Sequence, residues 1–332
     1  MPFSGVFGHA RPLALLAGSI ARGTLPPSLL FTGPDGVGKK LAALAVAEAL
    51  NCLSPRGHDA CGSCPACRRI ARGTHPDVLV IEPPDAGTTK IDQVRPAIAA
   101  TAYRPFEGRR RVVILDDADR LGDDAESALL KSLEEPAPGT VFILVTSRPE
   151  TLRATIRSRC SRLRFGRLAA GDVARFLTER HRCDAGEAHA IAAVSGGSPG
   201  RALESGSRAY RDARAAALSA LRTASTAASP KARLQAAASL AAGKPSSAAE
   251  RDELAARVTM LASLLRDLAL VAHGGRADRL ANSDLAADLG ELGATFGSGR
   301  ALRGFAAADR AVAALRRNAN PKVVAAWLAV NV

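Results

Sequence analysis

Aromatic residues are scarce in this chain of 332 residues, where they make up 4% of the sequence. A protein with so few large rings and abundant alanine is expected to build much of its core from helices packed through small side chains. The apolar runs are all shorter than a membrane span, and residues 1–9 hold no basic segment that leads into an apolar run. We therefore expect neither a membrane protein nor a secreted one, but a cytoplasmic protein.

Acidic residues are outnumbered, with 32 Asp and Glu against 45 Lys and Arg, which gives a formal charge of +13. This excess favours contact with a polyanion or with acidic protein partners. The arginines are scattered, however, without interleaved aromatic residues or a dense basic run, so charge alone leaves direct DNA binding as one hypothesis among others. Six cysteines, four of them clustered, fit a reducing compartment better than a disulfide framework.

Short apolar runs alternate with helical or loop segments in the first half of the chain. The runs are Ser28–Thr32, Val78–Ile81, Val112–Leu115 and Val141–Val145. This alternation predicts a parallel sheet flanked by helices, and we assign an α/β domain to residues 1–166. Beyond Phe165 the strand signals stop. Residues 167–207 are expected to form a small helical lid, and residues 208–332 a separate all-α domain.

A glycine-rich loop follows the first predicted strand and precedes a predicted helix. Its spacing, with Gly33, Gly36 and Gly38 before Lys39, is typical of a loop whose backbone amides curl around phosphates while the lysine reaches the outer ones. Lys40 occupies the position at which a working nucleotide hydrolase usually carries a Ser or Thr hydroxyl on magnesium. The sequence thus predicts a nucleotide-binding loop that lacks a metal ligand and has gained a second cation.

Two carboxylates and a threonine stand at the ends of later strands. Asp116 and Asp117 come directly after the apolar run that ends at Leu115, where a magnesium ligand and a water-activating base are needed. The second acid is usually Glu, and Asp117 is one methylene shorter. A catalytic pair and two solvated acids at a strand end are both compatible with this pattern. Thr146 is expected either near a γ-phosphate or as a helix cap.

Four cysteines follow the loop at the spacing of metal ligands. Cys61, Cys64 and Cys67 are separated by two residues each, and Cys52 ends the preceding predicted helix. Tetrahedral zinc takes four soft ligands that converge within a small radius. We expect a structural zinc module at about residues 52–67, since four cysteines leave no open position for catalysis.

Several phrases of the sequence together resemble the bacterial DNA polymerase III clamp-loader family of AAA+ proteins, over nearly the whole chain and most closely in its delta-prime branch. They are Ser28–Lys39, the cysteine set, Leu130–Pro136, Ser147–Leu152, Ser158–Cys160, Gly197–Ala202 and Asn318–Pro321. Motor subunits of the family also carry the cysteines. They would have Thr after Lys39 and Glu after Asp116, and this chain departs from the motor pattern at both places.

The resemblance implies an AAA+ domain, a lid and a helical collar, in a stator that hydrolyses ATP poorly or not at all. It also implies that Arg159 reaches across a subunit interface to the ATP of a neighbouring motor subunit, as an arginine finger. From the residues alone, Arg159 is either such a finger or a solvated surface charge. Arg201 matches the second sensor position of the lid.

The partners implied by the resemblance are the gamma or tau motor subunits, the delta subunit and, through the complex, the sliding clamp and primer-template DNA. Whether ATP or ADP is held without hydrolysis is left open by the sequence. The principal alternative is a self-sufficient motor ATPase that uses Asp116 and Asp117 despite Lys40. Nothing in the chain resembles a nucleotidyl-transfer site.

Overall fold

The computed structural model describes residues 2–332 except 85–86, 206–207, 227–247, 277–278 and 317–318. Asn318, one of the residues that carry the family resemblance, lies outside the described residues. The chain divides into two compact units, residues 1–168 and 169–332, and each is considered by itself. The further division of the second unit into lid and collar stays a prediction.

The first unit is built on a five-stranded parallel sheet with the strand order β2-β3-β4-β1-β5. Its strands are β1 (Ser28–Thr32), β2 (Val78–Ile81), β3 (Arg111–Leu115), β4 (Thr140–Thr146) and β5 (Ser161–Arg164). The four apolar runs of the sequence form β1 to β4. Every residue of β1, β3 and β4 is buried, because helices cover both faces of the sheet.

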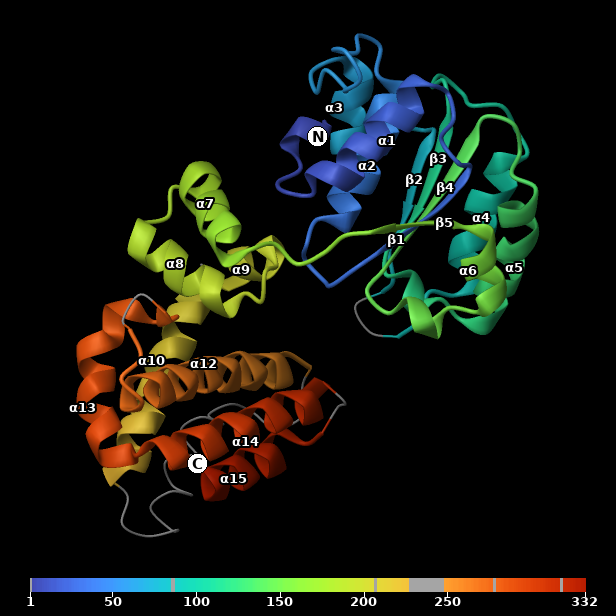
Figure 1. The fold of residues 1–332 in the computed structure, drawn as a ribbon. Coiled ribbons are helices and arrows are strands. Elements are labelled where there is room, and N and C mark those ends of the chain that lie inside the picture. Colours follow the sequence, from blue (N-terminus) through green and yellow to red (C-terminus); the bar gives the residue numbers. More distant parts are fainter. Residues whose placement is uncertain (1, 85–86, 206–207, 227–247, 277–278, 317–318) are drawn as a thin grey trace. The chain divides into compact units, whose positions relative to one another are not determined.

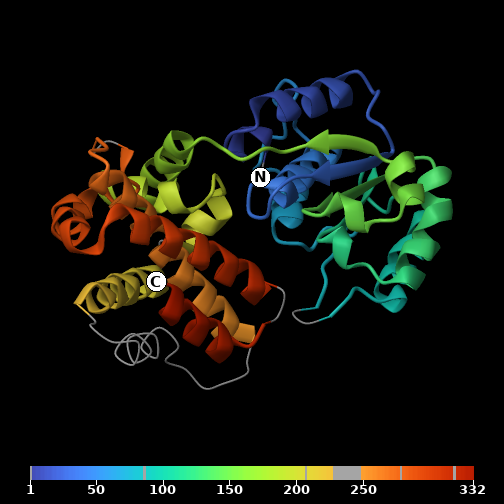
Figure 2. The same ribbon diagram turned by 60° about the horizontal axis from the view of Figure 1, so that its bottom comes forward.

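Helices lie on both faces of the sheet, as Figure 1 and Figure 2 show, and the buried side chains of the two faces form separate cores. One core joins the sheet to α1 (Ala10–Ala21) and α2 (Lys39–Asn51), and α3 (Pro65–Ala71) follows α2. The other core joins it to α4 (Ile91–Thr101), α5 (Asp123–Glu134) and α6 (Ala154–Arg159). Short 3-10 helices are η1 (Phe3–Gly5), η2 (Ala118–Arg120) and η3 (Pro149–Thr151).

Neighbouring residues on one strand serve opposite cores. In β1, Leu30 belongs to the core with α4 to α6, and Phe31 to the core with α1 and α2. This alternation is the two-residue period of a strand buried on both faces. Because all five strands are parallel, their carboxyl ends meet at one edge of the sheet, where ligands bind in open α/β folds.

Among the residues that the structure describes, all regular elements of the second unit are helices. Its helices are α7 (Ala170–His181), α8 (Ala185–Val194), α9 (Pro199–Ser205), α10 (Arg208–Thr226), α12 (Ala248–Ala272), η5 (Ser283–Leu285), α13 (Ala286–Phe296), α14 (Ser298–Arg316) and α15 (Pro321–Asn331). Helix α12 packs against α10, α13 and α14. Ala307, Ala308 and Ala311 of α14 are buried, so small side chains do line this packing, as the composition predicts. No helix among the described residues has both the length and the apolar content of a membrane span.

Candidate nucleotide loop, finger and zinc module

The loop between β1 and α2 has a backbone shape that depends on its glycines. Gly33, Gly36 and Gly38 have φ of 149°, 70° and 104°, values that side chains strongly disfavour. At Gly33 a Cβ atom would lie 2.0 Å from the carbonyl oxygen of Phe165, so no side chain fits there. The loop therefore turns sharply at three places before α2 begins at Lys39. This shape and the helix amino terminus are the two features with which such loops hold phosphate.

Lys39 is almost fully buried, and its ammonium group lies inside the loop. Its Nζ donates hydrogen bonds to the carbonyl oxygens of Gly33 and Pro34, both at 2.7 Å. Burial lowers the pKa of Lys39, while Asp35 and other nearby carboxylates act in the opposite direction. The side chain thus sits within the turn that it is expected to share with phosphate.

Lys40, the next residue, points to the carboxyl ends of β2 and β3. Its Nζ lies 3.1 Å from Oδ2 of Asp116 and 2.7 Å from Oε1 of Glu82. Burial alone would lower the pKa of Lys40, but its bonds to Glu82 and Asp116 outweigh burial and raise it. Lys40 is therefore a permanent cation, bound to the acid that the sequence predicts as a magnesium ligand.

Glu82 was missed by the sequence analysis, although a signal for it exists. It follows the last residue of β2, just as Asp116 follows the last residue of β3. The two strands are neighbours, and the Asp116 N–H donates to the carbonyl oxygen of Ile81 at 2.9 Å. Two acids at the ends of adjacent parallel strands are brought to the same edge of the sheet.

Magnesium does not fit the arrangement around Lys40. The residue after the loop lysine has no oxygen to offer the metal, and its ammonium group already binds Asp116. Asp117 has a left-handed backbone, with φ 44° and ψ 50°. Burial, followed by the charges of Asp116 and Asp119, raises the pKa of Asp117. The catalytic role considered for Asp117 stays a prediction.

Thr146 is fully buried at the end of β4, and its hydroxyl group is bound within the chain. Its Oγ1 donates to Oδ1 of Asp119 at 2.7 Å, and Arg148 lies 2.9 Å from Oδ2 of the same carboxylate. Burial would raise the pKa of Asp119, but these bonds from Thr146 and Arg148 lower it. The sequence predicts Thr146 at the end of a strand. It does not predict the contact with Asp119, because only the fold brings η2 beside β4.

Arg159 ends α6 and lies at the surface of the first unit with a third of its side chain exposed. Its guanidinium group forms an ion pair with Glu134, the last residue of α5, and donates to the carbonyl oxygen of Thr155 at 2.9 Å. Arg201 lies in α9 of the second unit, where its N–H donates to the hydroxyl of Ser198. Its approach to the nucleotide loop stays a prediction.

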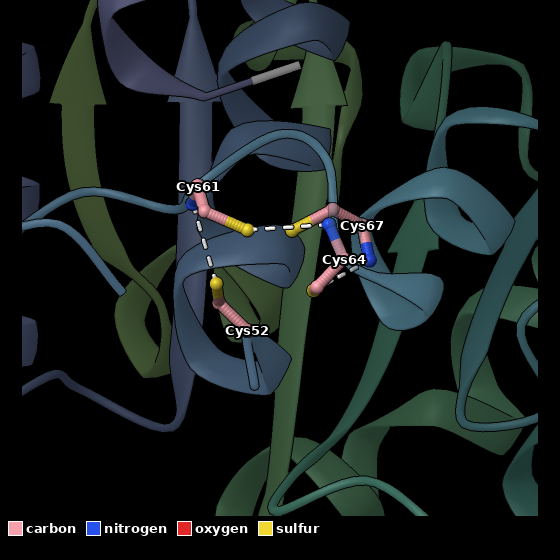
Figure 3. Close-up of side chains that lie close together, drawn as sticks. All are labelled: Cys52, Cys61, Cys64 and Cys67. Carbon is pink, nitrogen blue, oxygen red and sulfur yellow. Dashed lines mark hydrogen bonds between the residues drawn. The ribbon is translucent and has the colours of Figure 1, made fainter. Parts of the chain in front are cut away.

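The four predicted cysteines gather in the first unit, as Figure 3 shows. Cys52 caps the end of α2 and Cys61 lies in the following loop. Cys64 is the N-cap of α3, and Cys67 lies in the first turn of that helix. Their sulfur atoms all lie within 4.8 Å of one another. Four sulfurs around a tetrahedral zinc ion, at ~2.3 Å from it, are about 3.8 Å apart, so the set fits a structural zinc.

Backbone N–H groups already prepare these sulfurs for metal binding. The N–H groups of Cys61, Cys64 and Cys67 point to the sulfurs of Cys52, Cys61 and Cys64 at 3.2, 3.3 and 3.5 Å. N–H groups of Ser63 and Cys64 lower the pKa of Cys61 to about 6, whereas burial raises the pKa of Cys67. A bound zinc ion would hold all four as thiolates and tie α2 to α3.

A nucleotide loop at the carboxyl edge of a five-stranded parallel sheet, with helices on both faces, defines a P-loop protein of the AAA+ type. Residues 8–169 match the family model described as "DNA polymerase III, delta subunit". This match covers just under half of the chain, and the comparisons with individual proteins support a delta-prime-like subunit of the clamp loader.

The similar proteins include both delta-prime and tau subunits of DNA polymerase III. The delta-prime subunit of Pseudomonas aeruginosa is 38% identical over 188 residues, which are 56% of this chain and 57% of that protein. The delta-prime subunit of Bacillus subtilis is 37% identical over 47% of this chain and 46% of its own length. The tau subunit of Salmonella typhimurium is 36% identical over 48% of this chain and 24% of its own length. The chain thus spans about half the length of the delta-prime relatives.

Proposed function

We propose that this chain is a delta-prime-like stator of a clamp loader, which does not hydrolyse ATP itself and lends Arg159 to a neighbouring motor subunit. The observation that carries the first part is the ammonium group of Lys40, bound to Asp116 at 3.1 Å where a hydrolase needs magnesium. Without that metal, charge that develops on a transferring phosphoryl group would have no divalent partner. Turnover therefore depends on another subunit.

The position of Arg159 supports the second part of the proposal. Its guanidinium group is held at the end of α6 by Glu134 and by the carbonyl oxygen of Thr155, while part of the side chain faces solvent. A planar guanidinium fixed in this way can form paired hydrogen bonds with phosphate oxygens of an adjoining subunit. Such a group stabilises the charge of the transition state in phosphoryl transfer.

The partners that follow are the motor subunits of the gamma or tau type and the delta subunit. The sliding clamp and primer-template DNA would be reached through the assembled complex. The zinc module would serve the fold by fixing α3 against α2, and the helices of the second unit would join the collar of the assembly. ATP or ADP is the expected ligand of the loop, without turnover.

Replacement of Arg159 tests the finger. In a reconstituted clamp loader, Arg159→Ala should lower ATP turnover by as much as ~10³-fold if it is the sole finger at its site. Arg159→Lys should recover little of this loss, because a lysine cannot form the paired bonds of a guanidinium. Arg157→Ala removes an exposed arginine from the same helix and is the matched control, with turnover expected near that of the unchanged complex. Equal turnover of the Arg159 and Arg157 variants would reject the assignment.

An ATP hydrolysis assay of the isolated chain distinguishes the stator hypothesis from the motor ATPase hypothesis. We expect no magnesium-dependent ATP hydrolysis above background. Clear turnover that disappears in Lys39→Ala would instead establish a motor subunit, and would show that Asp116 reaches magnesium despite Lys40.

A further inference from the structure

The edge of the sheet beside the nucleotide loop holds a fixed positive charge where related sites recruit a metal. Lys40 Nζ lies between Oδ2 of Asp116 and Oε1 of Glu82, at 3.1 and 2.7 Å. These carboxylates come from β3 and β2, so the ammonium group bridges two adjacent strands. A magnesium ion would have to displace this cation, and would then lack the hydroxyl oxygen that residue 40 does not provide.

The parts of the site that hold phosphate are nevertheless all present. The loop keeps its three glycines in their special backbone shapes, and Lys39 lies inside the turn with its Nζ on two loop carbonyl oxygens. Those carbonyls are weak partners for an ammonium group compared with a phosphate oxygen. The site therefore combines an intact cradle for phosphate with two adjacent ammonium groups and no place for magnesium.

We propose that this loop binds a nucleoside diphosphate or triphosphate in its metal-free form, with the Lys40 ammonium group in the role of the magnesium ion. The proposal deepens the proposed function, on which it rests for the identity of the ligand as a nucleotide. Lys39 would bind the outer phosphates of a bound nucleotide. Lys40, beside Asp116, would neutralise part of the charge of these phosphates. Nucleotide then stabilises the subunit as a structural ligand that the chain cannot hydrolyse.

Calorimetric titration of the full chain with ADP and with ATP tests the proposal. Divalent ions are removed from the buffers with a chelating resin rather than with a soluble chelator, so that the cysteine site keeps its metal. The unchanged chain should bind nucleotide with dissociation constants that agree within about threefold with and without magnesium. In Lys40→Thr, which supplies the missing hydroxyl and frees Asp116, magnesium should tighten binding by about tenfold or more.

Two further variants keep the result interpretable. Lys40→Met removes the cation without adding a hydroxyl group, and should bind nucleotide weakly in both buffers, with no recovery by magnesium. Lys322→Thr makes a lysine-to-threonine change at an exposed position of α15 and should behave as the unchanged chain. Circular dichroism of each variant separates a loss of binding from a loss of folding.

Either of two outcomes overturns the proposal. One is no binding of ADP or ATP by the unchanged chain in either buffer, and the other is a tenfold or larger gain in its affinity on adding magnesium. Neither outcome bears on Arg159, whose effect is measured as ATP turnover by a neighbouring subunit in the complex. Conversely, unchanged ATP turnover of the complex with Arg159→Ala would not alter the nucleotide affinities measured for the isolated chain.

Discussion

A buried carboxylate at the amino end of β2 gives the sharpest test of what stabilises the first unit. Asp77 is fully buried and accepts hydrogen bonds from the N–H groups of Phe106, Glu107 and Gly108, at 2.7, 2.9 and 2.8 Å. Arg111, the first residue of β3, donates to it at 2.9 Å. Asp77→Asn replaces one of these acceptor oxygens by an NH₂ group that faces donors, and removes the charge that balances Arg111.

The pKa of Asp77 and the usual cost of breaking a buried ion pair both indicate the size of the effect. Burial alone would raise the pKa of Asp77, but the N–H groups and Arg111 lower it from 3.8 to about 2. That difference corresponds to about 2 kcal/mol of stability at neutral pH. Removal of one partner from a buried ion pair costs about 3 to 5 kcal/mol. We expect Asp77→Asn to destabilise the first unit by roughly 3 kcal/mol.

The lowered pKa of Asp77 also determines how its contribution to stability depends on pH. Because the carboxyl group is more acidic in the folded chain, its stabilising effect is fully present above about pH 4 and is lost as the pH falls through the folded value of about 2. The difference in stability between the unchanged chain and Asp77→Asn should therefore shrink over this acid range. A constant difference down to about pH 2 would mean that the charge of Asp77 is not the cause.

Hydrogen exchange of the amides of β2 and β3, followed in increasing urea, measures the stability of the first unit directly. The single tryptophan, Trp327, lies in α15 of the second unit, so its fluorescence serves as an internal control. Asp92→Asn makes the same chemical change at an exposed position of α4 and should have little effect. A loss below about 0.5 kcal/mol for Asp77→Asn would refute the reasoning from buried charge.

Two other changes test neighbouring features of the first unit. Cys67→Ser should lower the zinc content, measured by elemental analysis, well below one ion per chain, because it removes a fully buried thiolate, whereas Cys183→Ser in the second unit should leave zinc unchanged. Well under one zinc in the unchanged chain after gentle purification would contradict the structural metal. Thr146→Val should cost about 1 to 3 kcal/mol in urea unfolding, because it leaves the buried Asp119 with one donor fewer, and an unchanged midpoint would show that the hydroxyl is dispensable.

The nucleotide loop was predictable from sequence because its information is local. Glycines at fixed spacing before a lysine, between an apolar strand and a helix, allow one backbone shape, and β1 and α2 lie where this pattern predicts. Strand β5 was missed because it is an edge strand whose residues are largely exposed and include Arg162 and Arg164, so it lacks the apolar run of a buried strand. Helix α3 was not predicted, because it lies within the segment that carries the cysteines.

Contacts between segments far apart in the chain were harder to predict from the sequence. The lysine after the loop was recognised as a cation in the place of a metal, but its second partner, Glu82, depends on the pairing of β2 with β3. The partner of Arg159 could likewise be found only once α5 and α6 were packed together. The roles of Arg159 and Arg201 concern another subunit and the lid, and they stay predictions.

Phe165 links the loop to the route by which the chain leaves the first unit. Its ring packs against Phe31 and His9, its N–H bonds the carbonyl oxygen of Thr32, and its own carbonyl oxygen lies where a side chain of residue 33 would have to be. Only three residues separate it from the boundary at Leu168. A side chain at position 33 would therefore push away the backbone at Phe165, so the turn of the loop and the exit of the chain from the first unit share one steric constraint.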